Sequence, residues 1–143
     1  MNRKINCFVS FSVLDADEAS VRFLLDYLSK QCQERVNFKA YFNERSGTDL
    51  DRFMRADLGA ADAIMALFTP DYKNKADNHI HSGILIEYMH IVELLEGKSS
   101  EKPPLFIPVL WRGGAPEELS PNYFNGRELT RDLRALKPFQ GKG

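Results

Sequence analysis

The sequence AIMALF, at Ala63–Phe68, decides the fold, because six apolar residues in a row are typical of a strand that is buried on both faces. Such strands lie in the middle of parallel sheets, where helices cover both sides. Pro70 follows two residues later and ends the run. The chain is therefore expected to place a central parallel strand here, with helices above and below it.

Strand and helix patterns alternate on both sides of this run, as they do in sheets with crossover helices. The predicted strands are Ile5–Ser12, Val36–Phe42, the central run and Leu105–Trp111, with a short fifth element at Tyr123–Leu129. The predicted helices are Ala19–Gln31, Asp49–Leu58 and one from Ser82 onward, and residues 71–82 are predicted to form a long polar loop.

About five short strands with intervening helices predict an α/β fold, a doubly wound parallel sheet with flavodoxin-like strand order and helices on both faces. In that order, ligands bind outside the carboxyl ends of the first and third strands. The residues delivered to this edge are Ser10, Phe11, Ser12 and Asp15 from the first strand, and Thr69, Asp71 and Tyr72 from the third. One domain is expected over residues 1–137, and residues 138–143 are interpreted as the start of a linker or a disordered tail.

Composition excludes several classes of protein. The 143 residues carry a formal net charge of −1, which argues against general nucleic-acid binding. No signal peptide is visible, and no segment approaches the roughly 18 apolar residues that span a membrane. Cys7 and Cys32 lack metal-ligand spacing and are interpreted as free thiols in a reducing cytoplasm, and His79 and His81 have no third ligand nearby. We expect a cytoplasmic protein with no metal.

Glu87 occupies a position where a core residue is expected. Positions 84, 87, 88, 91 and 95 share one face of the predicted helix, and four of those five are apolar or aromatic. An unpaired buried carboxylate costs several kcal/mol or takes up a proton, so Glu87 is expected to border a cleft and to be the leading candidate for chemistry. The alternative is a solvated glutamate favoured by the positive end of the helix dipole.

Four segments of the sequence stand in a characteristic order and spacing. They are CFVSFS at 7–12 with Asp15 after it, FNERSGTDL at 42–50, ADAIMALFTPDY at 61–72 and GILIEY at 83–88. Together they resemble a TIR (Toll/interleukin-1 receptor) domain over nearly the whole chain. The third segment is especially similar to bacterial members, many of which are the effector half of anti-phage proteins fused to a cyclic-nucleotide sensor such as a STING-like module.

The resemblance implies that Glu87 is the glutamate that catalyses cleavage of NAD+. NAD+ is then the substrate and not a cofactor, and the product is linear or cyclic ADP-ribose. It implies that the loop at 43–49 is the BB loop, through which TIR domains form homo-oligomers. A fused sensor is expected beyond residue 143. Two features depart from the family: Gly83 stands where enzymatic relatives often have tryptophan, and the loop lacks the proline of animal receptors and adaptors. The alternative function is a non-catalytic scaffold for TIR–TIR interactions in signalling.

The chemistry itself explains why one glutamate can suffice. Cleavage of the N-glycosidic bond of NAD+ passes through an oxocarbenium-like ribosyl transition state, which a carboxylate stabilises, and nicotinamide leaves as a neutral molecule. Expected substrate contacts are Ser10, Ser12, Arg45 and the amides after Ser82 for the diphosphate, and Phe11, Phe42 or Tyr72 for an aromatic surface in place of the missing tryptophan. Each has a simpler alternative: a strand end, a solvated charge, a helix cap or core packing.

Overall fold

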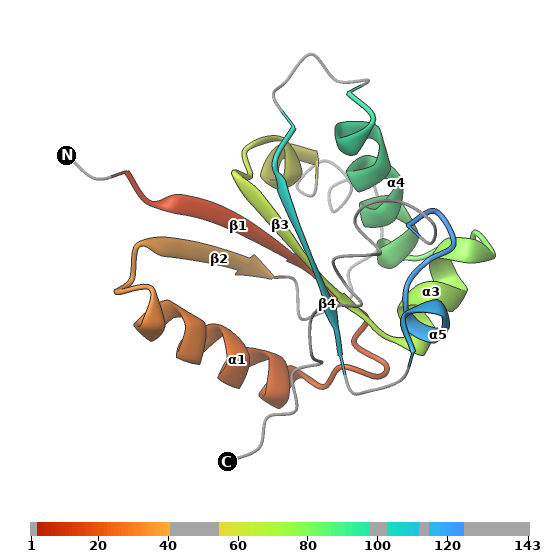
Figure 1. Cartoon of the computed structure of the whole chain (residues 1–143), viewed down its shortest axis with the longest axis horizontal. Helices are drawn as coiled ribbons and strands as arrows, with labels where there is room; N and C mark the ends of the chain where they lie inside the picture. The colour runs from red at the N-terminus through yellow and green to blue at the C-terminus, as the bar shows by residue number, and fades with distance from the viewer. Residues whose placement is uncertain (1–2, 41–54, 98–102, 112–114, 125–143) are drawn as a thin grey trace.

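The computed structural model describes residues 3–40, 55–97, 103–111 and 115–124. Four strands form one sheet in the order β2-β1-β3-β4, and all three neighbouring pairs are parallel (Figure 1). The strands are β1 at Ile5–Ser10, β2 at Val36–Ala40, β3 at Ala63–Phe68 and β4 at Leu105–Leu110. Each lies within the range that the sequence predicts.

The strand order reverses at β1, which has β2 on one side and β3 on the other. This is the flavodoxin-like arrangement, so the α/β prediction and the predicted switch point between the first and third strands are confirmed. The predicted fifth element begins at Tyr123, inside a turn at residues 122–124, and the rest of that element lies outside the described residues. The boundary at 137 and the tail at 138–143 lie outside them as well.

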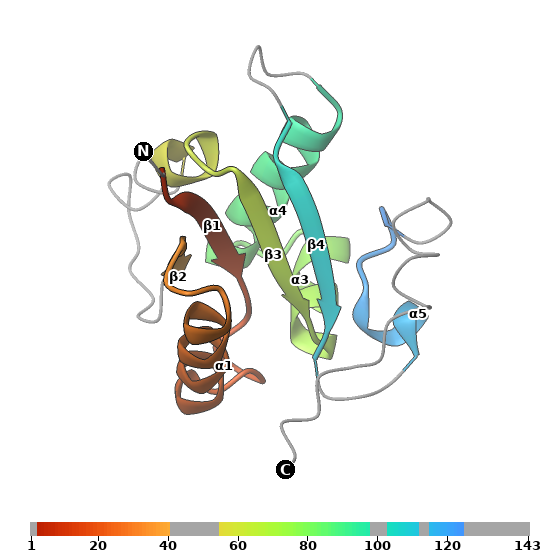
Figure 2. The same cartoon turned by 60° about the vertical axis from the view of Figure 1, so that its left-hand side comes forward.

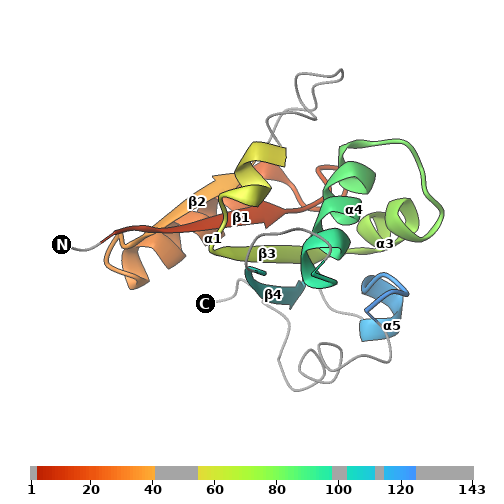
Figure 3. The same cartoon turned by 90° about the horizontal axis from the view of Figure 1, so that it is seen from above.

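Helices cover both faces of the sheet. Helix α1, Glu18–Gln31, lies on one side, and α4, Gly83–Leu95, lies on the other (Figures 1 and 2). Helix α3, Pro70–Asp77, lies beside α4, beyond the end toward which β1 and β3 point (Figure 3). A short helix α5, Pro116–Leu119, was not predicted. Among the described residues, no helix combines the length and apolar content of a transmembrane span.

Alternation along β1 decides which side chains meet which helices. Cys7 and Val9 belong to the hydrophobic cluster on the α1 side, whereas Phe8 belongs to the cluster that contains the apolar residues of α4. Because successive side chains of a strand point to opposite faces, Ser10 shares the α4 side with Phe8. The last residue of β1 thus presents a hydroxyl to the side of the sheet on which α4 packs its apolar residues.

The prediction of a polar loop at 71–82 is wrong, because α3 occupies Pro70–Asp77. The Thr69 side chain accepts a hydrogen bond from the Tyr72 amide at 3.2 Å, and Pro70 takes the first helical position, where no N–H is needed. Two ion pairs at i,i+4 spacing support the helix surface: Asp71 with Lys75 and Lys73 with Asp77. The helix is polar on most of its surface, so hydrophobic periodicity gives it little signal.

Candidate functional site

Glu87 lies on the buried face of α4. The residues of this helix with buried side chains are Ile84, Glu87, Ile91 and Leu94, so the predicted apolar column does contain a carboxyl group. Only 6% of Glu87 is exposed. Such burial removes the solvated alternative for this residue, and the carboxyl group needs partners inside the protein.

The partners come from two other elements. Ser10 Oγ, at the end of β1, donates a hydrogen bond to Glu87 Oε1 at 2.7 Å. The same Ser10 oxygen lies 2.8 Å from the hydroxyl of Tyr72, which belongs to the first turn of α3. Ser10 and Tyr72 are 0% and 1% exposed, so three polar side chains from β1, α3 and α4 form one buried cluster.

Local sequence explains why these groups meet. Ser10 pairs in register with Ala66 of β3, a small neighbour on the same face of the sheet, which leaves room beside the serine hydroxyl. Tyr72 is fixed by its capped amide and by an edge-to-face contact of its ring with Phe68, with centroids 5.2 Å apart. The cluster therefore lies at the carboxyl ends of β1 and β3, where this fold places ligands.

Burial sets the protonation of the cluster. Loss of solvation raises the pKa of Glu87 from 4.5 to about 8, and the hydrogen bond from Ser10 opposes this rise. Burial also raises the pKa of Tyr72, with the charge of Glu87 as the second cause. At neutral pH the carboxyl of Glu87 is therefore mostly protonated, and Tyr72 keeps its proton.

A second polar cluster borders the first. Ser12 Oγ donates to Asp71 Oδ2, the Asp71 amide donates to Asp15 Oδ2 at 2.8 Å, and Lys75 Nζ lies 2.9 Å from Asp71 Oδ2. Asp15 Oδ1 is buried and has no hydrogen-bond partner among the described residues. Ser12, Asp15 and Asp71 were expected at this edge. Lys75 was missed, although its i,i+4 spacing from Asp71 after a Thr-Pro start is a helix signal in the sequence.

Phe11 and Ser82 lie elsewhere. Phe11 is 5% exposed and packs in the hydrophobic cluster on the α1 side, across the sheet from Glu87. The Ser82 side chain accepts from the Leu85 amide at 3.2 Å and donates to the Ile80 carbonyl at 2.9 Å, which is the geometry of a helix cap. Phe11 thus takes part in core packing and Ser82 caps α4, and a substrate contact at either position stays a prediction. Phe42, Arg45 and the loop at 43–49 lie outside the described residues.

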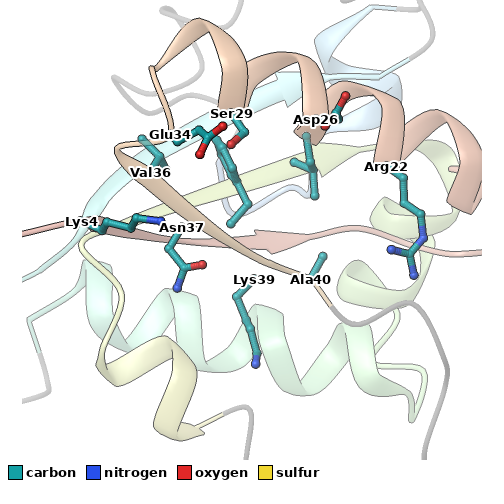
Figure 4. A pocket seen from close by; sticks show the side chains of 11 residues that line it. Lys4, Arg22, Asp26, Ser29, Glu34, Val36, Asn37, Lys39 and Ala40 are labelled. Carbon is teal, nitrogen blue, oxygen red and sulfur yellow. The ribbon is translucent and has the colours of Figure 1, made fainter.

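An open groove of about 690 Å³ lies at the edge strand of the described sheet, between α1 and β2 (Figure 4). Arg22 and Asp26 reach it from α1, and Asn37 and Lys39 from β2, so its lining carries charges of both signs. None of the predicted site residues lines it. The groove is thus separate from the cluster around Glu87.

Neither thiols nor metal ligands gather at the cluster. Cys7 is buried and Cys32 is partly buried, and both are free. Burial raises the pKa of the Cys7 thiol to about 11, so it is not a nucleophile at neutral pH. Within the part of the chain that the structure describes, no group of three or more His, Cys, Asp or Glu side chains is placed to hold a metal ion.

Comparison with known proteins identifies the fold. No protein-family model and no curated protein matches the chain. A solved structure described as a prokaryotic SEFIR domain matches with a TM-score of 0.56 and 22% sequence identity, over 87% of this chain and 84% of that one. At this identity the likeness shows the fold alone. The chain has an α/β fold like that of the SEFIR-domain structure, with the flavodoxin-like strand order that the sequence predicts.

Proposed function

We propose that this domain cleaves NAD+ to nicotinamide and ADP-ribose, with Glu87 as the catalytic carboxylate. One observation carries the proposal: a buried acid at the carboxyl ends of β1 and β3, held by Ser10, in a TIR-like fold. Buried acids with strongly raised pKa values at ligand-binding edges are candidates for catalysis. The resemblance of the sequence to NAD-cleaving TIR domains supplies the reaction.

The reaction breaks the bond between C1′ of the ribose and the nicotinamide nitrogen. The bonding electrons go to the pyridinium ring, so nicotinamide leaves neutral, and positive charge develops on the ribosyl group. Ionised Glu87 stabilises that charge and accepts hydrogen bonds from the ribose hydroxyls. Water then bonds to C1′ and loses one proton, which gives ADP-ribose. If a group of the substrate attacks in place of water, the product is cyclic.

Glu87 must be ionised to play this role. Its pKa of about 8 means that only a minor fraction of the resting protein carries the charged form at pH 7. Positive charge on the nicotinamide end of NAD+ near the site favours the ionised form. Substrate binding and ionisation of Glu87 are therefore expected to be coupled.

The test is nicotinamide release from NAD+ by concentrated protein. Glu87→Gln keeps the shape of the side chain and removes its charge, and the rate should fall at least about 100-fold. Glu93→Gln is the matched control, because Glu93 lies on the same helix with 60% of its side chain exposed, and its rate should stay near that of the wild type. Retention of most activity by Glu87→Gln would refute the catalytic role. Absence of release from every variant, clustered or not, would favour the scaffold alternative.

Activation by assembly belongs to the same proposal. We place the domain in the cytoplasm as the effector part of an anti-phage protein, where a fused cyclic-nucleotide sensor brings copies together. The resemblance to bacterial TIR domains supports this placement, and the contact is expected at the loop 43–49. Concentration dependence of the rate, treated in the Discussion, is its test.

A further inference from the structure

We propose that Ser10 and Tyr72 are positioning residues that hold Glu87 through a one-way chain of hydrogen bonds, leaving Oε2 as the oxygen that meets the ribose. The inference rests on the function proposed above. It assigns the roles of the two buried hydroxyls, which were expected to contact the substrate themselves.

The direction of the chain follows from counting protons. When Glu87 is ionised its carboxylate can only accept, so the single proton of the Ser10 hydroxyl goes to Glu87 Oε1, 2.7 Å away. The contact of 2.8 Å between Ser10 Oγ and the Tyr72 hydroxyl must then have Tyr72 as its donor. The chain therefore runs from Tyr72 to Ser10 to Glu87. Each bond polarises the next, so Tyr72 strengthens the bond that Ser10 makes to the carboxyl.

The two carboxyl oxygens of Glu87 are not equivalent. Oε1 accepts from Ser10, whereas Oε2 has no hydrogen-bond partner among the residues that the structure describes. Fixing one oxygen fixes the rotation of the carboxyl group, and so it fixes where the other one points. After ionisation Oε2 is the free acceptor for a ribose hydroxyl or the developing charge.

Each member of the chain is held by a different element. Ser10 ends β1, Tyr72 is anchored by the Thr69 cap of α3, and Glu87 lies in the second turn of α4. Tyr88 contributes a minor electrostatic effect on Tyr72, and the titratable side chains of the bordering cluster are Asp15, Asp71 and Lys75. The hydroxyl of Ser10 is thus the main group that favours ionisation of Glu87, because it donates to the charged form.

The experiment compares Ser10→Ala and Tyr72→Phe with Tyr123→Phe. Tyr123 is the matched control, because its hydroxyl also donates to a glutamate, Glu96 at 3.0 Å, away from the cluster. Protein labelled with ¹³C at glutamate carboxyls is titrated by NMR, and the Glu87 signal is identified by its absence from Glu87→Gln. The Glu87 midpoint should move to higher pH in Ser10→Ala, move less in Tyr72→Phe, and stay at the wild-type value in Tyr123→Phe.

Activity gives the second readout. Ser10→Ala should lower kcat about 10- to 100-fold, as expected for a hydrogen bond to a charged group, with a small change in KM. Tyr72→Phe should lower kcat a few-fold. An unchanged or lowered Glu87 midpoint in Ser10→Ala overturns the chain, and if that variant does not fold, an unchanged midpoint in Tyr72→Phe overturns it equally. Shifted midpoints in a protein that never cleaves NAD+ would support the chain and refute the proposed function. A large rise in KM with unchanged kcat would make Ser10 a substrate contact.

Discussion

At the scale of single residues, the unusual feature is an acid that stays protonated at neutral pH. Glu87 keeps its proton because burial disfavours its charged form, and the hydroxyl of Ser10 only partly offsets that effect. In the unfolded chain the same carboxyl has an ordinary pKa near 4.5. Folding therefore changes the affinity of one group for protons, and stability must depend on pH.

The sign of that dependence is fixed. Between pH 4.5 and about 8 the folded protein keeps a proton on Glu87 that the unfolded chain has lost. The free energy of unfolding should thus fall as pH rises through this window, by up to about 1.4 kcal/mol per pH unit from this group. Urea unfolding of the wild type and Glu87→Gln measures it. The difference between the two proteins should change steadily with pH, whereas Glu93→Gln should follow the wild type. Parallel curves for Glu87→Gln and the wild type would contradict the raised pKa.

Phe11 is expected to contribute to stability and not to substrate binding. Because its ring packs on the α1 side of the sheet, Phe11→Leu should lower stability by about 1 kcal/mol. The KM for NAD+ should not change, because the residue lies across the sheet from Glu87. Steady-state kinetics with NAD+ and a denaturation curve of the same variant test this prediction. Weakened NAD+ binding at unchanged stability would return Phe11 to the role of an aromatic platform.

At the scale of elements, the sequence predicted those helices and strands whose positions depend on hydrophobic pattern. The central strand, α1 and α4 bury apolar faces, and their positions were predicted to within a few residues. Helix α3 was missed because its stability comes from a cap and from ion pairs on a polar surface. The contact between Ser10 and Glu87 joins residues 77 apart, and only the packing of α4 on the sheet brings them together. The sequence could place both at one edge but not show that they are bonded.

The cap of α3 can be tested directly. Thr69→Val keeps the shape of the side chain and removes the oxygen that accepts from the Tyr72 amide. It should lower the free energy of unfolding by about 1 kcal/mol. Thr69→Ser keeps the oxygen and should retain more stability than the valine variant in the same thermal or urea measurement. The reverse order would show that packing of the methyl group, and not the cap, governs this position.

At the scale of the whole molecule, one sheet with helices on both faces brings two polar clusters to one edge. Ser10 ends β1 and Ser12 follows it, and Asp71 and Tyr72 begin α3 after β3, so chain topology gathers four polar side chains at the edge of the sheet where Glu87 lies. Two hydrophobic clusters, one on each face, hold this edge in place. The site is a property of the strand order and not of any one segment.

Assembly should control activity at this scale. If copies must meet through the loop 43–49, the rate of NAD+ cleavage per molecule should rise steeply with protein concentration, and fusion to a dimerising partner should raise it at low concentration. Arg45→Glu, in that loop, should weaken both clustering and cleavage without lowering Tm. Full activity of a highly diluted monomer, with no effect of Arg45→Glu, would show that assembly does not control activity.

The most direct test of the central claim, that ionised Glu87 acts on NAD+, is the pH profile of kcat/KM for nicotinamide release. This quantity reports the ionisation of the free enzyme. Because the charged form is the active one and its pKa is about 8, kcat/KM should rise with pH and reach half of its maximum near that value. The residual rate of Glu87→Gln should show no such rise. A wild-type profile that is flat from pH 6 to about 9, or that falls with rising pH, would contradict the claim.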